Sequence, residues 1–278
     1  MSPSTAATQG RMLRNTRALH AGPLVRPLVG PLVSLLAACT APRPSLAPTQ
    51  IAVPGTETRA AAAGWLNGGD WLAQHGEIAR IAREQPLDLV FIGDSITQSW
   101  GDPKRAVAAT GRAAWNEHYG SLRAASFGIS GDCTQHVLWR VERLDFAHGA
   151  PRAIVLLIGT NNLSAGDSPS AVAQGIRAIA GRLRERWPEA RLVLLGILPR
   201  GERAEDPLRL AAREVNRRIA ELGDEQRIFY RDLEPWFVDA AGQAHAERLA
   251  GDHLHLTAAG YAAWAEALEP LLGQCLGE

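Results

Sequence analysis

Residues 87–95 read Leu-Asp-Leu-Val-Phe-Ile-Gly-Asp-Ser, a short apolar run that ends at Gly93 and passes directly into a serine. A run of this length and composition, closed by glycine, is typical of a strand that is buried on both faces. Because Ser95 follows the strand within a Gly-Asp-Ser triplet, we expect a tight turn that exposes its hydroxyl. Taken alone, such a triplet is more often an ordinary turn or a helix cap.

Four more runs with strand character follow along the chain, at residues 122–127, 153–158, 191–197 and 227–230. Apolar side chains at helical spacing occur between and after them, at residues 170–187, 208–222 and 258–272. Strands that alternate with helices imply right-handed crossovers and a parallel sheet with helices on both faces. The sequence therefore predicts a three-layer α/β/α domain with a five-stranded parallel sheet.

The N-terminal residues 1–38 have the pattern of a secretory signal. Arginines precede an apolar stretch at residues 28–38, which is too short to span a bilayer. The stretch runs into Leu36-Ala37-Ala38-Cys39, which resembles the lipobox of bacterial lipoproteins. That resemblance implies cleavage before Cys39 and lipidation of its sulfur. A plain signal peptide that happens to contain a cysteine is the alternative, and Met12 is a second candidate for the start codon.

Residues 39–64 are rich in proline and alanine, which predicts an extended tether between a lipidated Cys39 and a globular domain at 65–278. We therefore expect a protein of the bacterial cell envelope, anchored to a membrane through lipid, or a secreted one. Four of the 29 basic residues are arginines that lie before residue 27, and the remaining 25 face 29 acidic residues. A net charge of −4 gives the body of the protein no electrostatic reason to bind nucleic acid.

Asp252-His253-Leu254-His255 precedes the last predicted helix. In a helical turn, a spacing of three would place Asp252 and His255 on one face. The carboxylate would then orient the imidazole, and the other ring nitrogen would act as a base toward Ser95. An isolated Asp-x-x-His is more often a helix cap beside a half-buried histidine.

Acyl transfer also needs hydrogen-bond donors aimed at the developing oxyanion. The strand at 153–158 leads into Gly159-Thr160-Asn161-Asn162, so the Asn161 amide is one candidate donor. The strand at 122–127 leads into Gly128-Ile129-Ser130-Gly131-Asp132, where Gly131 lets the backbone approach a substrate closely. Each of these segments alone is compatible with ordinary turn chemistry.

In combination, these blocks resemble the SGNH (GDSL-type) hydrolases. The resemblance implies a flavodoxin-like fold, no metal or other cofactor, and a small-molecule ester as substrate. It also implies the site roles: Ser95 as nucleophile, His255 as general base and then acid, Asp252 as its orienting partner, and an oxyanion hole formed by the N–H groups of Ser95 and Gly131 with the side chain of Asn161.

The blocks are similar to one branch in particular, the catalytic subunits of the intracellular brain-type platelet-activating-factor acetylhydrolase and their bacterial relatives. They lie at residues 71–75, 127–132, 136–140, 159–162, 198–201 and 254–257. Two features depart from that branch. Ser130 stands where glycine is common, and the lipoprotein-like N-terminus is not part of the intracellular enzymes. Because the related subunits pair, the resemblance leaves a homodimer open.

Ile96, Thr160 and Leu254 flank the predicted nucleophile, oxyanion donor and base, and they are our candidates for the wall of an acyl pocket. All three are mid-sized, which predicts a short acyl group, acetyl above all. The sequence leaves the alcohol part of the ester open and favours neither an O-acetylated glycan nor a lysophospholipid-like acetyl ester as the substrate. A non-catalytic ligand- or glycan-binding lipoprotein on the same scaffold is the alternative function, since fold does not fix function.

The three cysteines, Cys39, Cys133 and Cys275, are too few for a disulfide scaffold and are not spaced as in a CxxC zinc site. A bridge between Cys133 and Cys275 stays open at this point. Asp252, His253 and His255 lack the further converging histidines that a metal site needs, so we expect no metal.

Overall fold

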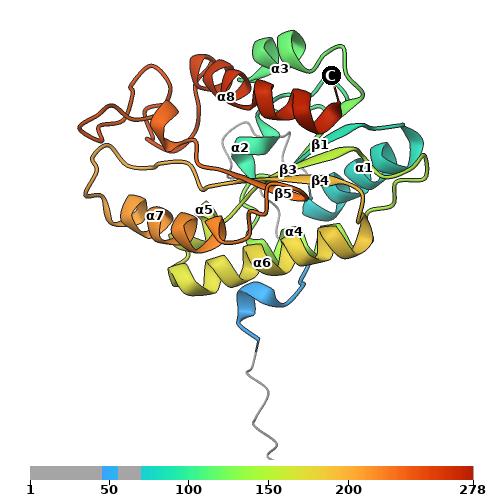
Figure 1. Cartoon of the computed structure of the whole chain (residues 1–278), viewed down its shortest axis with the longest axis horizontal. Coiled ribbons are helices and arrows are strands. Elements are labelled where there is room, and N and C mark those ends of the chain that lie inside the picture. Colours follow the sequence, from blue (N-terminus) through green and yellow to red (C-terminus); the bar gives the residue numbers. More distant parts are fainter. Residues whose placement is uncertain (1–45, 56–69, 278) are drawn as a thin grey trace, which may run out of the picture. The chain divides into compact units, whose positions relative to one another are not determined.

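The computed structural model describes residues 46–55 and 70–277 of the chain. Its centre is a single parallel sheet of five strands in the order β2-β1-β3-β4-β5 (Figure 1). The strands are β1 Leu89–Gly93, β2 Ala124–Gly128, β3 Ala153–Leu157, β4 Arg191–Leu195 and β5 Ile228–Arg231. The predicted five-stranded parallel sheet is confirmed, and each strand lies within or close to its predicted run.

Helices cover both faces of the sheet (Figure 1). One face packs against α1 Trp71–Glu84, α4 Thr134–Arg143, α6 Pro169–Arg186 and α7 Pro207–Ala220, and the other against α3 Arg112–His118 and α8 Ala258–Leu276. The short helices are α2 Ser95–Gln98, α5 Thr160–Ser164, η1 Pro48–Gln50 and η2 Glu234–Trp236. The three-layer α/β/α architecture is therefore confirmed.

The strand sequences explain why both faces are covered. Successive side chains of a strand point to opposite faces, so a strand buried on both sides must be apolar throughout. In β1, Val90 belongs to the apolar cluster under α1, α4, α6 and α7, whereas Phe91 belongs to the cluster under α3 and α8. All five residues of β1 are buried.

The order of the strands determines where a site can form. The chain passes from β1 to β2 on one side and then returns to β3 on the other side of β1. Val90 is accordingly paired with Ala125 of β2 and with Ile154 of β3. In open parallel sheets, ligands bind at the carboxyl ends of the strands where the order reverses in this way. The segments that follow β1, β2 and β3 all start at that edge.

Residues 46–55 pack against the domain, and we call them the N-terminal strap. Thr49 is buried, with 1% of its surface exposed. Its hydroxyl donates a hydrogen bond to the Ala171 carbonyl at 2.7 Å, and its own carbonyl accepts one from the Thr134 hydroxyl at 3.0 Å. Gly175 on α6 makes room, because a Cβ at that position would come within 2.8 Å of the Thr49 carbonyl oxygen.

Over residues 46–55 the packed strap differs from the extended tether expected for 39–64, and the rest of that range lies outside the described residues. Proline-rich composition indicates an extended backbone, but it does not reveal that one threonine in this stretch has hydrogen-bond partners on two helices. The predicted signal peptide at 1–38 and Cys39 lie outside the described residues. Within the part of the chain that the structure does describe, no helix is long and apolar enough to cross a bilayer.

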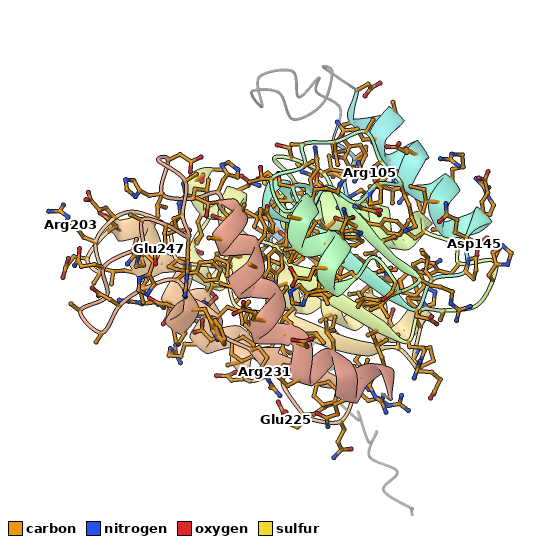
Figure 2. All side chains as sticks on the ribbon, turned by 90° about the horizontal axis from the view of Figure 1, so that it is seen from above. Arg105, Asp145, Arg203, Glu225, Arg231 and Glu247 are labelled. Atoms are coloured by element: carbon orange, nitrogen blue, oxygen red, sulfur yellow. The ribbon has the colours of Figure 1, made fainter. Side chains whose placement is uncertain are left out.

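Figure 2 labels Arg231 and Glu225, two charged residues near the ends of β5. Arg231 at the end of β5 pairs with Glu225, with 2.9 Å between Nη1 and Oε1. Half-exposed pairs of this kind contribute little to stability. Cys133 and Cys275 are both free thiols, so the structure contains no bridge between them.

Candidate active site

Ser95 stands at the carboxyl end of β1, as the first residue of α2. The turn between them requires glycine at position 93, because a Cβ there would collide with the Thr97 hydroxyl and the Leu157 carbonyl. Asp94 caps α2, since its Oδ1 accepts a hydrogen bond from the Ile96 N–H at 3.0 Å. The strand–turn–serine arrangement expected from the sequence is therefore present, but the expected exposure is wrong, because Ser95 is buried with 5% of its surface exposed.

The structure brings Ser95, His255 and Asp252 into one hydrogen-bonded chain. Ser95 Oγ lies 3.0 Å from His255 Nε2, although 160 residues separate the two in sequence. The other ring nitrogen of His255, Nδ1, lies 2.6 Å from Asp252 Oδ2. When Nδ1 carries the proton and donates it to Asp252, Nε2 is free to accept a proton from the serine hydroxyl.

Asp252 and His255 meet in a tight turn and not in a helical one. His253 between them has a positive φ of 50°, and α8 begins only at Ala258. Asp252 Oδ1 closes the turn by accepting the N–H groups of Leu254 and His255, each at 3.0 Å. The carboxylate thus uses one oxygen for the backbone and the other for the imidazole, which fixes the ring.

The pKa values of two carboxyl groups near Ser95 are shifted in opposite directions. Partial burial acts to raise the pKa of Asp252, but the hydrogen bonds from the His255 ring and the backbone outweigh it, and the pKa lies below its usual value. Asp94 is fully buried, and this burial raises its pKa to about 7 despite the hydrogen bond from Ile96. Asp252 is therefore the carboxylate that stays ionised beside the histidine at neutral pH.

Three candidate oxyanion donors come from the ends of three strands. Within the described residues, neither the Ser95 N–H nor the Gly131 N–H has a protein acceptor. Gly131 follows β2 and has a positive φ of 76°, which glycine adopts without strain. Asn161 follows β3 and donates one amide hydrogen to the Asp132 carbonyl at 2.9 Å, which leaves its second amide hydrogen for a ligand.

The three candidate residues of the acyl pocket also lie at this edge of the sheet. Ile96 and Thr160 are each 2% exposed, and Leu254 is half-buried against the cluster under α8. Thr160 is held by Arg200, whose Nη1 donates to the threonine hydroxyl at 3.1 Å. Burial lowers the pKa of Arg200, and the negative charges of Asp252 and Asp94 oppose that shift.

Sequence reasoning assigned no role to several side chains that support the site, among them Trp71, Asp132, Arg140, Arg200 and Tyr261. The first four lie in the sequence blocks at 71–75, 127–132, 136–140 and 198–201 that resemble the acetylhydrolase branch, so the signal was present. What the sequence does not show is which of these distant blocks meet in space. Tyr261 lies on α8 and its hydroxyl donates to the Ile96 carbonyl at 2.6 Å, a contact between residues 165 positions apart.

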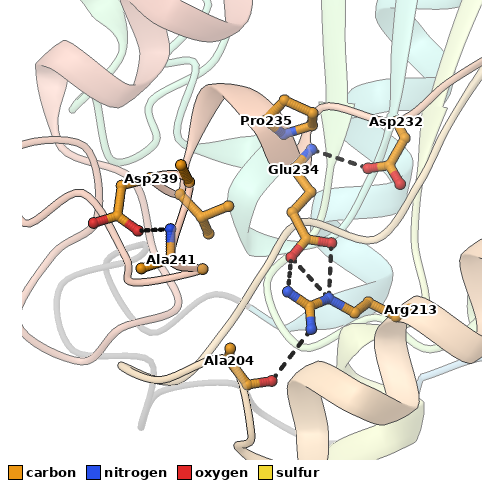
Figure 3. Close-up of a pocket in the computed structure, with 10 residues that line it drawn as sticks. Ala204, Arg213, Asp232, Glu234, Pro235, Asp239 and Ala241 are labelled. Atoms are coloured by element: carbon orange, nitrogen blue, oxygen red, sulfur yellow. Dashed lines mark hydrogen bonds and ion pairs between the residues drawn. The ribbon is translucent and has the colours of Figure 1, made fainter.

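A cavity of about 600 Å³ lies elsewhere, between the β4–α7 connection and the segment after β5 (Figure 3). Arg213 and Glu234 in its wall form an ion pair at 2.6 Å, and none of the residues discussed above as candidate catalytic groups lines it. The other two lining carboxylates, Asp232 and Asp239, accept hydrogen bonds from backbone N–H groups, and we do not assign the reaction to this cavity. Across residues 46–55 and 70–277, no group of three or more His, Cys, Asp and Glu side chains is placed to hold a metal ion.

The arrangement contains the parts that acyl transfer requires. A serine hydroxyl lies within hydrogen-bond distance of an imidazole that a carboxylate orients. The N–H groups of Ser95 and Gly131 have no acceptor among the described residues. A base of this kind activates a hydroxyl, which is otherwise a weak nucleophile. Preorganised N–H donors stabilise the oxyanion that forms when the hydroxyl attacks a carbonyl.

Comparison with known proteins points to the same chemistry. Residues 91–263 match the model of the GDSL-like Lipase/Acylhydrolase family. The chain is 37% identical over 212 residues to the human platelet-activating factor acetylhydrolase IB subunit alpha1, covering 76% of this chain and 86% of the relative. It is 34% identical over 215 residues to the rat subunit alpha2, covering 77% of this chain and 88% of that relative.

Solved structures share the fold. A protein of Streptococcus pneumonia described as a platelet activating factor is 25% identical and superposes with a TM-score of 0.61, over 72% of this chain and 92% of the other. A catalytic mutant of Axe2, an acetylxylan esterase from Geobacillus stearothermophilus, is 19% identical with a TM-score of 0.54, over 69% and 95% of the two chains, which shows the fold alone. On the match of its sequence to the family and to these relatives, the chain belongs to the GDSL-like lipase/acylhydrolases and is an ester hydrolase by family.

Proposed function

We propose that the protein is a serine esterase that hydrolyses short-chain esters, acetyl esters above all, through an acyl-enzyme on Ser95. The observation that carries this proposal is the 3.0 Å contact between Ser95 Oγ and His255 Nε2, with Asp252 on the far side of the ring. Family membership supports ester hydrolysis as the reaction class.

The reaction follows from the positions of these groups. His255 Nε2 removes the proton from Ser95 Oγ as the oxygen attacks the carbonyl carbon of the ester. The oxyanion accepts hydrogen bonds from the N–H groups of Ser95 and Gly131 and from the Asn161 amide. His255 then protonates the leaving alcohol. Water, deprotonated by His255, attacks the acyl-enzyme, and the acid leaves as Ser95 regains its proton.

The short acyl group is supported by the wall residues and by the relatives. Ile96, Thr160 and Leu254 are mid-sized, and the first two are buried and fixed by Tyr261 and Arg200. The named relatives at 34–37% identity are acetylhydrolase subunits. As the substrate, we propose an O-acetylated glycan or a lysophospholipid-like acetyl ester.

The test is hydrolysis of p-nitrophenyl esters from acetate to octanoate by the compact unit Pro44–Glu278, which retains the N-terminal strap. We expect the highest kcat/KM for acetate and loss of turnover in Ser95→Ala. Faster cleavage of octanoate would overturn the short acyl pocket. If well-folded wild type and Ser95→Ala are equally inactive on every ester, the proposal fails in favour of a binding protein on this scaffold.

For location, we propose that Cys39 is lipidated and anchors the protein in the bacterial cell envelope. The support is the Leu-Ala-Ala-Cys sequence at 36–39 after an apolar stretch. Metabolic labelling with a radioactive fatty acid should mark the full chain and should not mark Cys39→Ala. Equal labelling of both would overturn the assignment. A homodimer, suggested by the pairing of related subunits, is tested by the sedimentation of the purified protein.

A further inference from the structure

Asp132 is a fully buried carboxylate directly after Gly131, and the proposed reaction does not use it. None of its surface is exposed. A buried carboxylate is costly unless it is paired and hydrogen-bonded, so the contacts of Asp132 indicate why it is retained.

Its two carboxylate oxygens are held by two different helices. Arg140 on α4 donates from Nε to Oδ2 at 2.9 Å, and Trp71 on α1 donates from Nε1 to Oδ1 at 2.7 Å. Both partners are themselves fully buried. The carboxylate therefore cannot turn without breaking a hydrogen bond to one of two closely packed side chains.

Arg140 extends the network to the strand that carries the nucleophile. Its Nη2 donates to the Gly93 carbonyl at 3.0 Å, and its Nη1 donates to the Phe127 carbonyl at 2.9 Å. Gly93 ends β1 two residues before Ser95, and Phe127 lies near the end of β2. One guanidinium thus ties Asp132 to the carboxyl ends of both strands.

The backbone of Asp132 reaches the remaining oxyanion donor. Its carbonyl accepts the Asn161 amide at 2.9 Å, and its own N–H donates to the Ile129 carbonyl at 3.1 Å. Through its chain neighbour Gly131, its carbonyl and its carboxylate, Asp132 is therefore connected to every group that we place in the oxyanion hole.

We propose that Asp132, held by Trp71 and Arg140, is the positioning residue that sets the spacing of the three oxyanion donors. This inference rests on the proposed esterase reaction. Loss of one donor to an oxyanion lowers kcat by roughly a hundredfold to a thousandfold, and misplacement by a fraction of an ångström loses part of that. Removal of one of the two hydrogen bonds that hold the Asp132 carboxylate should therefore lower kcat and leave KM largely unchanged.

The experiment compares Trp71→Phe with Trp264→Phe. Both tryptophans are fully buried, so both changes leave a similar cavity. Trp71→Phe removes the hydrogen bond to Asp132. Trp264→Phe removes no hydrogen bond, because Trp264 Nε1 has no hydrogen-bond partner in the described structure. With p-nitrophenyl acetate, we expect kcat to fall by about tenfold in Trp71→Phe with KM within about twofold of wild type, and Trp264→Phe to retain the wild-type kcat.

A second readout measures the oxyanion hole without turnover. Ser95 Oγ attacks the phosphorus of a fluorophosphonate and fluoride leaves, and the phosphoryl oxygen of the tetrahedral adduct occupies the same hole; mass spectrometry follows the rate of labelling. We expect slower labelling in Trp71→Phe than in Trp264→Phe. Asp132→Asn should be slower still, and if that variant does not fold, the tryptophan pair decides.

The outcomes separate the two proposals. If wild type turns over and is labelled at Ser95, but the two tryptophan variants behave alike, the positioning role is overturned while the esterase stands. If Trp71→Phe raises KM and leaves kcat unchanged, the network shapes substrate binding and the positioning role is likewise overturned. If wild type neither turns over nor reacts at Ser95, the esterase proposal fails and takes this inference with it.

Discussion

The hydroxyl of Tyr261, on the C-terminal helix α8, donates a hydrogen bond to the backbone carbonyl of Ile96, 2.6 Å away in α2. α2 is a helix of four residues and begins with Ser95. A helix this short has little stability of its own. The hydrogen bond from Tyr261, near the C-terminal end of the chain, therefore fixes α2, the helix that carries the proposed nucleophile.

We predict that Tyr261→Phe lowers the free energy of unfolding by about 1–2 kcal/mol, because it leaves the Ile96 carbonyl without this donor. Tyr119→Phe is the matched control, since the buried hydroxyl of Tyr119 has no hydrogen-bond partner in the described structure. Urea denaturation of the two variants compares them directly. Equal destabilisation would show that the Tyr261 hydroxyl contributes no more than the unpaired one.

Asp252→Asn should lower kcat for p-nitrophenyl acetate by about 10²–10⁴-fold. Oδ1 of residue 252 accepts two backbone N–H groups, so the new amide nitrogen would face His255 Nδ1 as a donor. That arrangement favours the tautomer in which Nε2 carries the proton and does not act as a base.

Steady-state kinetics at pH 7–8 provide the measurement. Asp239→Asn serves as control, since Asp239 caps a surface turn at Ala241 with the same kind of backbone contact. A decrease of less than tenfold in Asp252→Asn would mean that His255 does not depend on Asp252 for its orientation.

We predict that the folded protein loses stability in acid because of the buried side chain of His75. Burial lowers its pKa to about 4, and the positive charges of Arg140 and Arg143 add to the shift. Between about pH 6.5 and pH 4 the unfolded state binds a proton at this histidine and the folded state does not, so the free energy of unfolding falls as the pH falls. The contribution lost across this window is up to about 3 kcal/mol.

His75→Phe should remove that contribution while keeping an aromatic ring stacked on Trp71. Denaturation curves at pH 7 and pH 4.5 should show a smaller stability difference in this variant than in wild type. His148→Gln, at an exposed histidine, should behave as wild type. An undiminished difference in His75→Phe would place the acid sensitivity elsewhere.

Thr49→Val should loosen the N-terminal strap by about 1 kcal/mol, because it deletes the hydroxyl that donates to Ala171 and nearly preserves the volume. Thr49→Ser retains the hydroxyl and is the control. Hydrogen exchange of residues 46–55 should become faster in the valine variant alone, with esterase activity unchanged. Equal exchange in the two variants would show that this hydrogen bond does not hold the strap.

Much of the fold follows from local pattern. The β1 and β3 runs are apolar throughout because both faces of the sheet are covered, and such runs are visible without any tertiary information. The helix α6 begins at Pro169 after Ser168, whose side chain accepts the Ala171 N–H, and these start signals can be read from the sequence.

What could not be predicted depends on contacts between distant segments. The spacing of Asp252 and His255 suggested a helical turn, whereas the positive φ of His253 gives a tighter one. Similarly, Trp71 and Arg140 were visible as members of the family-like sequence blocks. Their hydrogen bonds to Asp132 were not, and Trp71 lies 61 positions and Arg140 8 positions from Asp132 in the chain. Burial and pairing of that carboxylate are properties of the packed core, which no local pattern contains.

The packed strap also sets how far the domain stands from a membrane if Cys39 carries lipid. Composition alone predicted an extended tether over residues 39–64, but only residues 40–45 separate Cys39 from Leu46, where the described strap begins. At no more than about 3.5 Å per residue, that linker reaches roughly 25 Å. An esterase held this close would meet substrates in a layer about one domain thick above the bilayer, so local ester density at the surface, and not diffusion through the compartment, would govern its supply.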